Sequence, residues 1–200
     1  VEPDAVIGHS VGEILAAYLD KVLTLKDAAH IICVRAKLMA SLPKTGGMLA
    51  IEAGIDNIKS LLEYYPRTYL AGYNTDNQLI ISGERSNLDA FKSEAISSGF
   101  KCSELNVSHA FHSPEMHPMI SEFETMLKGI KFSSSSGKMY STVTGKRITN
   151  ETESIEYWSK QILSPVLYKD AICALSEENR NLFIEIGPKP ILINLTKQIL

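Results

Sequence analysis

The pattern of hydrophobic and polar positions along the chain changes repeatedly between one typical of strands and one typical of helices. This predicts strands alternating with helices. Apolar runs such as Met48–Ala53 predict strands, while apolar residues three and four positions apart predict amphipathic helices. The clearest helix begins at Thr24, with Asp27 three residues later in the manner of a capping box. It should end near Leu42, before Pro43.

Residues 46–106 form a small unit in this pattern. Asn74 begins the connection between its two middle strands, where an asparagine is usually a turn residue. The predicted element order, β-α-β-β-α-β, is that of a ferredoxin-like subdomain inserted into the chain. Its elements are Met48–Ala53, Ile55–Tyr64, Thr68–Tyr73, Gln78–Ser82, Ser86–Ser98 and Lys101–Leu105.

Strands and helices also alternate on either side of this unit, which indicates an α/β core with a mainly parallel sheet. We expect residues 1–45 and 107–200 to form that core. The serine run Ser133–Ser136 is expected to be a solvated loop. The elements predicted after the insert are a helix from Ser113 to Lys128, a strand Met139–Val143, helices Ile155–Ile162 and Leu167–Ser176, a buried strand Leu182–Ile186 and a helix Ile191–Leu200.

The motif Gly-x-Ser-x-Gly lies between an apolar pair and a helix-forming run near the start of the chain. Strand, sharp turn and helix are the context in which this motif presents a nucleophilic serine, here Ser10. The N–H of Val11 would then point toward a developing oxyanion. The simpler alternative is a serine that caps a helix after a glycine turn. Because only nine residues precede Ser10, we expect part of the flanking sheet to come from sequence outside these 200 residues.

Arg35 falls in the middle of the apolar stripe of the second predicted helix, between Ile31 and Leu38. An arginine that faces a core must find an anion or bear a large desolvation cost. That anion could be a structural carboxylate or a substrate, and the side chain could instead reach the surface.

His112 directly precedes Ser113 and Pro114, which fit the N-cap and first position of a helix. A helix N-terminus disfavours a protonated ring and keeps the imidazole neutral, as a general base must be. No acid between Ser10 and His112 is obviously placed for a hydrolase triad, since Asp76 and Asp89 fall in the insert. The pair is therefore interpreted as a Ser–His dyad.

The composition of the chain argues against several classes of function. The chain has 44% hydrophobic residues and a net charge of −3, with no basic stripe for nucleic acid and no apolar run that would span a bilayer. Its three cysteines, Cys33, Cys102 and Cys173, are far apart and lack metal-ligand spacing. We expect reduced, mostly buried thiols in a cytoplasmic protein, and no metal site.

Taken together, the ordered motifs resemble the acyltransferase domains of modular polyketide synthases and the malonyl-CoA:acyl-carrier-protein transacylases. The resemblance covers essentially the whole chain and implies an α/β-hydrolase-like core. Its motifs are Gly8–Glu13, Arg35–Met39, Asn74 with Ile80–Gly83, His109–Pro114, Gln161 with Pro165-Val166, and Glu185–Pro188.

The resemblance implies a role for each site residue. Ser10 is similar to the family's nucleophile and His112 to its base, oriented by a main-chain group at Gln161. Arg35 would hold the free carboxylate of malonyl, and the Val11 N–H would supply half of the oxyanion hole. The remaining residues expected to bind substrate are His9, Asn74, His109 and Phe111. The version His109-Ala110-Phe111-His112 resembles malonyl-selective members, in which the bulk of the phenylalanine leaves less room for a methyl group.

The activity implied is transfer of malonyl from malonyl-CoA, through a Ser10 ester, to the phosphopantetheine thiol of an acyl carrier protein in polyketide or fatty-acid biosynthesis. No bound cofactor is implied, and the partners would be the carrier protein and neighbouring synthase domains on the ketosynthase side. In the family a second oxyanion donor comes from a Gly-Gln-Gly-type segment nearer the N-terminus, so we expect these 200 residues alone to be poorly active. The alternatives are a serine hydrolase such as a thioesterase, and a non-catalytic scaffold that keeps the fold.

Overall fold

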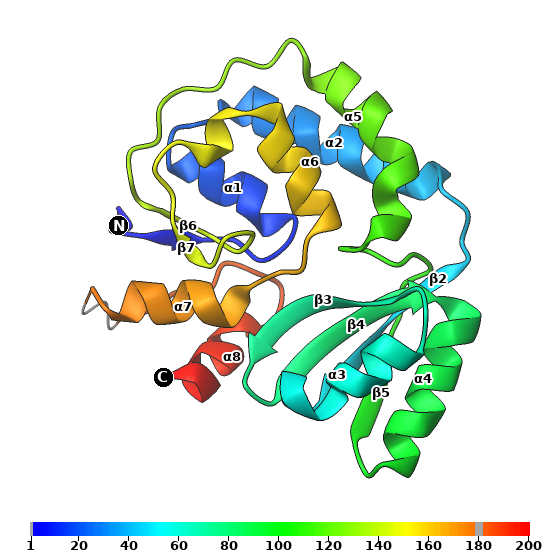
Figure 1. Cartoon of the computed structure of the whole chain (residues 1–200). Helices are drawn as coiled ribbons and strands as arrows, with labels where there is room; N and C mark the ends of the chain where they lie inside the picture. The colour runs from blue at the N-terminus through cyan, green and yellow to red at the C-terminus, as the bar shows by residue number, and fades with distance from the viewer. Residues whose placement is uncertain (1, 179–181) are drawn as a thin grey trace.

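The computed structural model describes residues 2–178 and 182–200, which contain two separate sheets (Figure 1). The first sheet has the order β1-β6-β7 and the second the order β3-β4-β2-β5. The strands of the first sheet are β1 (Val6–Ile7), β6 (Met139–Ser141) and β7 (Lys146–Arg147).

The first sheet is mixed, so the expectation of a mainly parallel sheet is wrong for the described residues. β1 and β6 are parallel, with Val6 opposite Met139, whereas β6 and β7 are antiparallel. The chain reverses tightly after β6 because Gly145 adopts a φ of 69°, a left-handed conformation that glycine tolerates. The result is a hairpin in place of a crossover.

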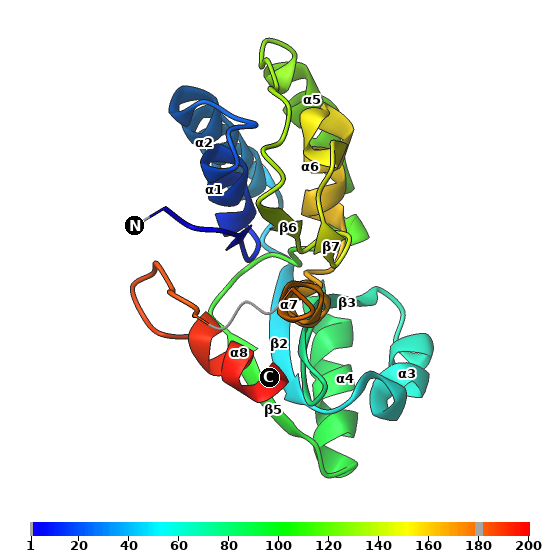
Figure 2. The same ribbon diagram turned by 90° about the vertical axis from the view of Figure 1, so that its left-hand side faces the viewer.

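Four helices pack around this sheet and share one core. Figure 2 shows α1 and α2 on one side and α5 and α6 on the other. Ile14, Phe123 and Trp158 are among the side chains buried between them. The helices are α1 (Gly12–Leu19), α2 (Leu25–Ser41), α5 (Ile120–Leu127) and α6 (Ile155–Leu163).

One helix start follows the local signal in the sequence fully, and a second follows it in part. Thr24 Oγ1 accepts a hydrogen bond from the backbone N–H of Asp27, as the capping box predicts. Ser113 caps the segment after His112, but that segment begins as a 3₁₀ helix over Pro114–Met119 and becomes α-helical only in α5. Pro118 lies within it and cannot donate a backbone hydrogen bond, which accounts for the tighter turns.

The second sheet has the element order expected for residues 46–106, and all its neighbouring strands are antiparallel. Figure 1 shows α3 and α4 covering one face of it. Asn74 lies inside β3, so the expectation that it begins the following connection is wrong. The elements are β2 (Gly46–Glu52), α3 (Ile55–Tyr64), β3 (Thr68–Thr75), β4 (Gln78–Glu84), α4 (Arg85–Ser97) and β5 (Lys101–Leu105).

An edge of the second sheet is tied to the chain that follows α6. The N–H of Tyr73 donates to the carbonyl of Val166 (2.8 Å), and the N–H of Val166 donates to the carbonyl of Ala71 (2.9 Å). Helix α7 (Tyr168–Ser176) lies between the two sheets, and α8 (Leu192–Ile199) lies next to α7 at the side of the second sheet (Figures 1 and 2). The edge strand β3 is therefore joined by backbone hydrogen bonds to the segment that follows α6.

The serine run is a loop without regular structure in which Ser133, Ser134 and Ser136 are exposed, as expected, and a buried carboxylate anchors it. Asp20 is fully buried and accepts hydrogen bonds from Ser135 Oγ (2.5 Å), Ser136 Oγ (2.6 Å) and the N–H of Lys138 (2.8 Å). These contacts lead the chain directly into β6.

The predicted buried strand Leu182–Ile186 is also wrong. Its residues have no strand assignment, and the side chains of Leu182, Ile184 and Ile186 are exposed. A strand needs a hydrogen-bonded neighbour, and none of the described strands pairs with this segment. This apolar segment therefore has no sheet to join among the described residues.

The cysteines are free, but they are less buried than expected: Cys33 is exposed, and Cys102 and Cys173 are half-buried. Among the described residues, no helix combines the length and apolar character needed to cross a membrane.

Candidate active site

Ser10 occupies the turn between β1 and α1 in a left-handed conformation, with a φ of 53°. This backbone is uncommon for residues other than glycine, and it is the strained turn that a nucleophile motif presents. Gly8 makes the turn possible, since a Cβ there would lie 2.2 Å from the carbonyl carbon of Gly12. The start of α1 therefore packs directly on the backbone of Gly8.

Ser10 and His112 are hydrogen-bonded to each other across 102 residues of sequence, with 2.7 Å between Oγ and Nε2. The Nδ1 of His112 lies 3.0 Å from the carbonyl oxygen of Ser164 and 3.2 Å from that of Gln161. Carbonyl oxygens only accept, so Nδ1 carries the proton and Nε2 is left to accept the Ser10 hydroxyl proton. Among residues 2–178 and 182–200, no carboxylate is hydrogen-bonded to His112.

His112 is buried and its pKa is lowered to about 3. Burial is the largest cause, and the positive charge of Arg35 and the nearby His9 act in the same direction. The two backbone carbonyls oppose the shift. The imidazole is therefore neutral at neutral pH.

Arg35 reaches the same place from α2. Its side chain is 6% exposed, and its Nη2 lies 3.3 Å from Ser10 Oγ. Its Nε has no hydrogen-bond partner, and no ion pair to Arg35 is formed by a carboxylate of the described residues. Burial lowers its pKa to about 10, which leaves the guanidinium charged at neutral pH. Of the open alternatives, pairing with a structural carboxylate and reaching the surface do not describe this side chain.

Glu13, the last residue of the first motif, is a fully buried carboxyl group behind the nucleophile turn. It accepts hydrogen bonds from the Tyr157 hydroxyl (2.6 Å) and the N–H of Thr142 (2.9 Å). Burial raises its pKa, and these hydrogen bonds oppose the shift. Glu13 thereby joins α1, α6 and the end of β6 beneath the site.

His9 connects the nucleophile turn to the second sheet. Its Nε2 donates to Asn74 Oδ1 (3.1 Å), and its ring lies against Tyr168 with centroids 5.6 Å apart. Asn74 is buried in β3. Burial lowers the pKa of His9, and the Asn74 hydrogen bond opposes that shift.

His109 and Phe111 flank the base on the loop before it. The His109 Nε2 donates to the carbonyl of Leu42 at the end of α2, and its Nδ1 accepts from the Ser108 hydroxyl (both 3.1 Å). Its ring stacks on Phe111, with centroids 5.6 Å apart. Both nitrogens of His109 are therefore bonded within the protein. Gly46 lies behind this loop, where a Cβ would be 2.4 Å from the N of Ala110.

Gln161 contacts the nucleophile residue through its side-chain amide, and Val11 follows Ser10 directly in the chain. The side-chain Nε2 of Gln161 donates to the backbone carbonyl of Ser10 (2.7 Å). The N–H of Val11, at the start of α1, donates to no acceptor among residues 2–178 and 182–200. It is available to an oxygen outside the chain.

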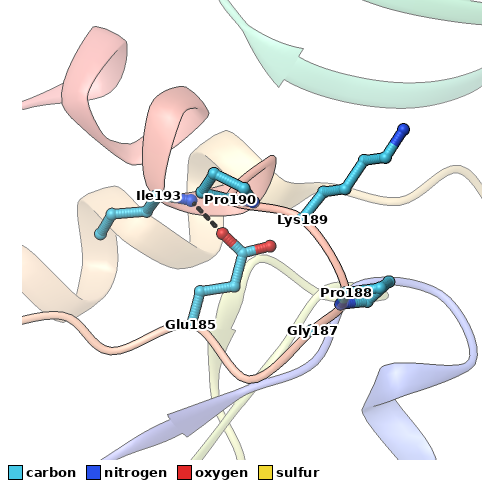
Figure 3. A pocket seen from close by; sticks show the side chains of 6 residues that line it. All are labelled: Glu185, Gly187, Pro188, Lys189, Pro190 and Ile193. Carbon is cyan, nitrogen blue, oxygen red and sulfur yellow. Dashed lines mark hydrogen bonds between the residues drawn. The ribbon is translucent and has the colours of Figure 1, made fainter.

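A hollow of about 300 Å³ lies elsewhere, at the turn before α8. Figure 3 shows the Glu185 carboxylate within it, bonded to the N–H of Ile193 (2.9 Å). It contains neither Ser10 nor His112. Its lining residues are Glu185, Gly187, Pro188, Lys189, Pro190 and Ile193.

The structure thus gathers Ser10, His112, Arg35 and Gln161 in one place, with the other predicted residues around them. Sequence reasoning missed Ser164, whose only contribution is a backbone carbonyl and which carries no side-chain signal. It also missed the role of Glu13, although a glutamate in the first turn of an apolar helix is a cue to a buried partner.

Known proteins resemble this chain over its whole length. All of residues 1–200 match the acyl transferase domain family. The chain is 33% identical over 204 residues to the PKS-NRPS hybrid synthetase acdB of Aspergillus candidus and 38% identical over 192 residues to polyketide synthase GfsB of Streptomyces halstedii. These matches cover 100% and 94% of this chain but only 8% and 3% of those proteins.

Solved structures of acyltransferases also resemble the fold of this chain over its whole length. The acyltransferase domain from the second module of the salinomycin polyketide synthase superposes with a TM-score of 0.95 at 32% identity, over all of this chain and 47% of that one. The malonyl CoA-acyl carrier protein transacylase of Clostridium perfringens gives a TM-score of 0.93 at 28% identity, over all of this chain and 65% of that one. With the whole sequence matched and the serine, histidine and arginine together in space, the chain belongs to the acyl transferase domain family.

Proposed function

We propose that this chain carries the nucleophile, base and acyl-binding arginine of a malonyltransferase. The group moved would pass from malonyl-CoA, through an ester on Ser10, to the phosphopantetheine thiol of an acyl carrier protein in polyketide or fatty-acid biosynthesis. Ser10 and His112 serve as catalytic residues, Gln161 and Ser164 as positioning residues for the base, and the Val11 N–H as an oxyanion donor.

The observation that carries the proposal is the unpaired guanidinium beside the nucleophile. Arg35 is buried and charged, forms no ion pair with a carboxylate of the described residues, and has its Nη2 3.3 Å from Ser10 Oγ. A carboxylate on the acyl group supplies the missing anion through a charge-assisted, bidentate contact. Malonyl carries such a carboxylate two carbons from the reacting carbonyl, and acetyl does not.

The reaction follows from the hydrogen bonds. Ser10 Oγ attacks the thioester carbonyl while His112 Nε2 takes the hydroxyl proton, and the oxyanion forms near the Val11 N–H. The C–S bond then breaks, and CoA leaves as a thiol with the proton from His112. In the second half, the carrier thiol gives its proton to His112 and attacks the ester. Ser10 then leaves and regains that proton.

Selectivity among carboxylated acyl groups is assigned to the loop before His112. Phe111 would restrict room for an α-methyl group, a discrimination that is worth about 1–3 kcal/mol for one methyl. His109 supports Phe111 through stacking and through the Leu42 carbonyl, so we assign it a positioning role in place of direct substrate contact. His9 and Asn74 are likewise assigned to positioning, because their polar atoms face each other.

The proposed organisation is an α/β-hydrolase-like core over 1–45 and 107–200, interrupted by a ferredoxin-like subdomain over 46–106. The sheet order β3-β4-β2-β5 with helices on one face supports the second assignment. The partners would be a carrier protein and neighbouring synthase domains. A thioesterase has no use for a buried unpaired arginine, and a scaffold has no use for a strained serine with a bonded neutral base.

The test compares Arg35→Ala with Lys37→Ala, an exposed lysine on the same helix, in the full-length protein. Ester formation on Ser10 is measured by mass spectrometry with malonyl-CoA and acetyl-CoA in separate reactions. We expect Arg35→Ala to reduce malonyl loading about 10- to 150-fold relative to acetyl loading, because it removes a charge-assisted hydrogen-bonded pair with the malonyl carboxylate. Lys37→Ala should match the wild type, and Ser10→Ala should abolish both esters. If Arg35→Ala loses both esters equally, Arg35 does not bind the acyl carboxylate. If the wild type forms no ester on Ser10, the proposed activity is refuted.

A further inference from the structure

The side chain and the backbone of Gln161 contact opposite halves of the serine–histidine pair. Its carbonyl oxygen accepts from His112 Nδ1, while its side-chain Nε2 donates to the carbonyl of Ser10 at 2.7 Å. The side chain is 2% exposed, so water does not compete for this bond. If Gln161 only oriented His112, the hydrogen bond from its side chain to the Ser10 carbonyl would have no explanation.

The Ser10 carbonyl is the other end of the peptide group that carries the Val11 N–H. A trans peptide is planar, and its C=O and N–H point in opposite directions. A donor that fixes the carbonyl therefore fixes the direction of the N–H. The N–H of Glu13 also donates to the Ser10 carbonyl, at 3.0 Å, so two donors hold this one oxygen. Hydrogen bonds in such a chain polarise each other, which strengthens the free N–H as a donor.

The Ser10–Val11 peptide also needs contacts from other parts of the chain to hold its conformation. Ser10 has a φ of 53°, a conformation that persists only where surrounding contacts hold it. Gly8 restricts the turn from the side of α1, and Gln161 holds it from α6. The Val11 N–H itself has no acceptor among the described residues.

We propose that the Gln161 side chain is a positioning group for the oxyanion donor: it holds the Ser10–Val11 peptide plane so that the Val11 N–H faces the reacting carbonyl oxygen. This inference rests on the proposed acyl transfer through Ser10. It is separate from the orientation of His112, which uses the backbone of the same residue.

The test uses Gln161→Met, which keeps the length of the side chain and the backbone carbonyl but removes the amide donor. Gln161→Asn is the second variant, because its amide is one methylene too short to keep a 2.7 Å contact. Ser159→Ala is the matched control, since it removes a buried hydrogen bond to Glu124 from the same helix. Each variant is made in the full-length protein, and folding is checked by thermal unfolding.

Three readouts are taken: labelling of Ser10 by a fluorophosphonate, single-turnover loading from malonyl-CoA and acetyl-CoA, and the pH profile of labelling. We expect both Gln161 variants to lose about 10- to 100-fold in labelling and in loading rate, below the full loss of an oxyanion donor. The loss should be equal for the two acyl groups. The malonyl-CoA concentration for half-maximal loading and the midpoint of the pH profile should stay unchanged.

Labelling at the wild-type rate in Gln161→Met would overturn the proposal, as would a displaced pH midpoint, which would place the effect on His112. Unfolding of both Gln161 variants while Ser159→Ala folds would assign the side chain a structural role only. A wild type that labels with fluorophosphonate but does not load malonyl would refute the proposed function and still leave the labelling comparison as a test of Gln161.

Discussion

At the scale of single residues, Ser10 and His112 share a backbone property as well as a hydrogen bond. Both have a left-handed φ, 53° and 56°, that non-glycine residues rarely adopt. Such conformations cost about 1–3 kcal/mol each and are retained where neighbouring contacts fix them. Here those contacts are the packing of α1 on Gly8 and the carbonyls of Gln161 and Ser164.

The pH dependence of the nucleophile is a prediction at this scale. A base works in its neutral form, and a lowered pKa moves the acid limb of its activity to lower pH. Because the pKa of His112 is lowered to about 3, fluorophosphonate labelling of Ser10 should be constant from about pH 5 to 8. Arg35 stays charged over that range, since its pKa is about 10. An acid limb with a midpoint near the ordinary histidine value of about 6.5 would contradict this.

Local pattern was enough to find Ser10, Arg35 and His112, because each is marked by its own neighbours in the sequence. The Gly-x-Ser-x-Gly turn, the apolar stripe and the helix cap all act within a few residues. The Asn74 contact could not be found in this way. It depends on a pairing across 65 residues, and the local signal of an asparagine near a hairpin indicates a turn.

At the scale of elements, a single carboxylate determines how the chain reaches the first sheet. Asp20 ends α1 and binds Ser135, Ser136 and the N–H of Lys138, more than a hundred residues away in the sequence. Lys138 immediately precedes β6, which pairs with β1. The connection between α5 and β6 is therefore anchored by side-chain hydrogen bonds in place of regular structure.

We expect Asp20→Ala to lower the free energy of unfolding by about 3 kcal/mol, because hydrogen bonds to a buried charge each contribute about 1.5–3 kcal/mol and their donors lose a partner. Urea unfolding of the variant and the wild type measures the difference. Asp89→Ala removes an exposed carboxylate and should change stability by less than about 0.5 kcal/mol. Similar effects of the two substitutions would show that the Asp20 contacts do not stabilise the fold.

Elements with local start signals were predicted well, and those that depend on a distant partner were not. Helix α2 follows from its cap and stripe, and α6 and α7 match the predicted helices closely. The serine run is a loop as predicted, but its hydrogen bonds to Asp20 were not predicted, because they join residues more than a hundred positions apart. The segment 182–186 was misjudged because an apolar run forms a strand only where another strand is available to pair with it.

At the scale of the whole molecule, the second sheet supports the site through one edge. Strand β3 is bonded to Val166, two residues beyond the Ser164 carbonyl that contacts the base. The same strand carries Asn74, which contacts His9 beside the nucleophile. The β3 edge of the second sheet therefore contacts the segments that hold Ser10 and His112 in place.

Asn74→Leu tests this support. The substitution keeps the size of the side chain and leaves the His9 N–H without its acceptor, at a cost of about 1–3 kcal/mol. We expect fluorophosphonate labelling of Ser10 to slow about tenfold. Asn77→Leu, in the exposed turn of the same hairpin, should label at the wild-type rate. If the two variants label equally fast, the second sheet does not hold the nucleophile in place.

The two carbonyl partners of His112 have a chemical consequence for the acceptor. A base that lacks an anionic partner, and that lies near a guanidinium, has low proton affinity. Such a base can assist a thiol, with a pKa of about 8.5, far more readily than water, with a pKa of about 15.7. In the proposed reaction, the acyl-serine ester would persist against hydrolysis until a thiol arrives. The lower pKa of the thiol would thus favour transfer to the carrier over loss of the acyl group to solvent.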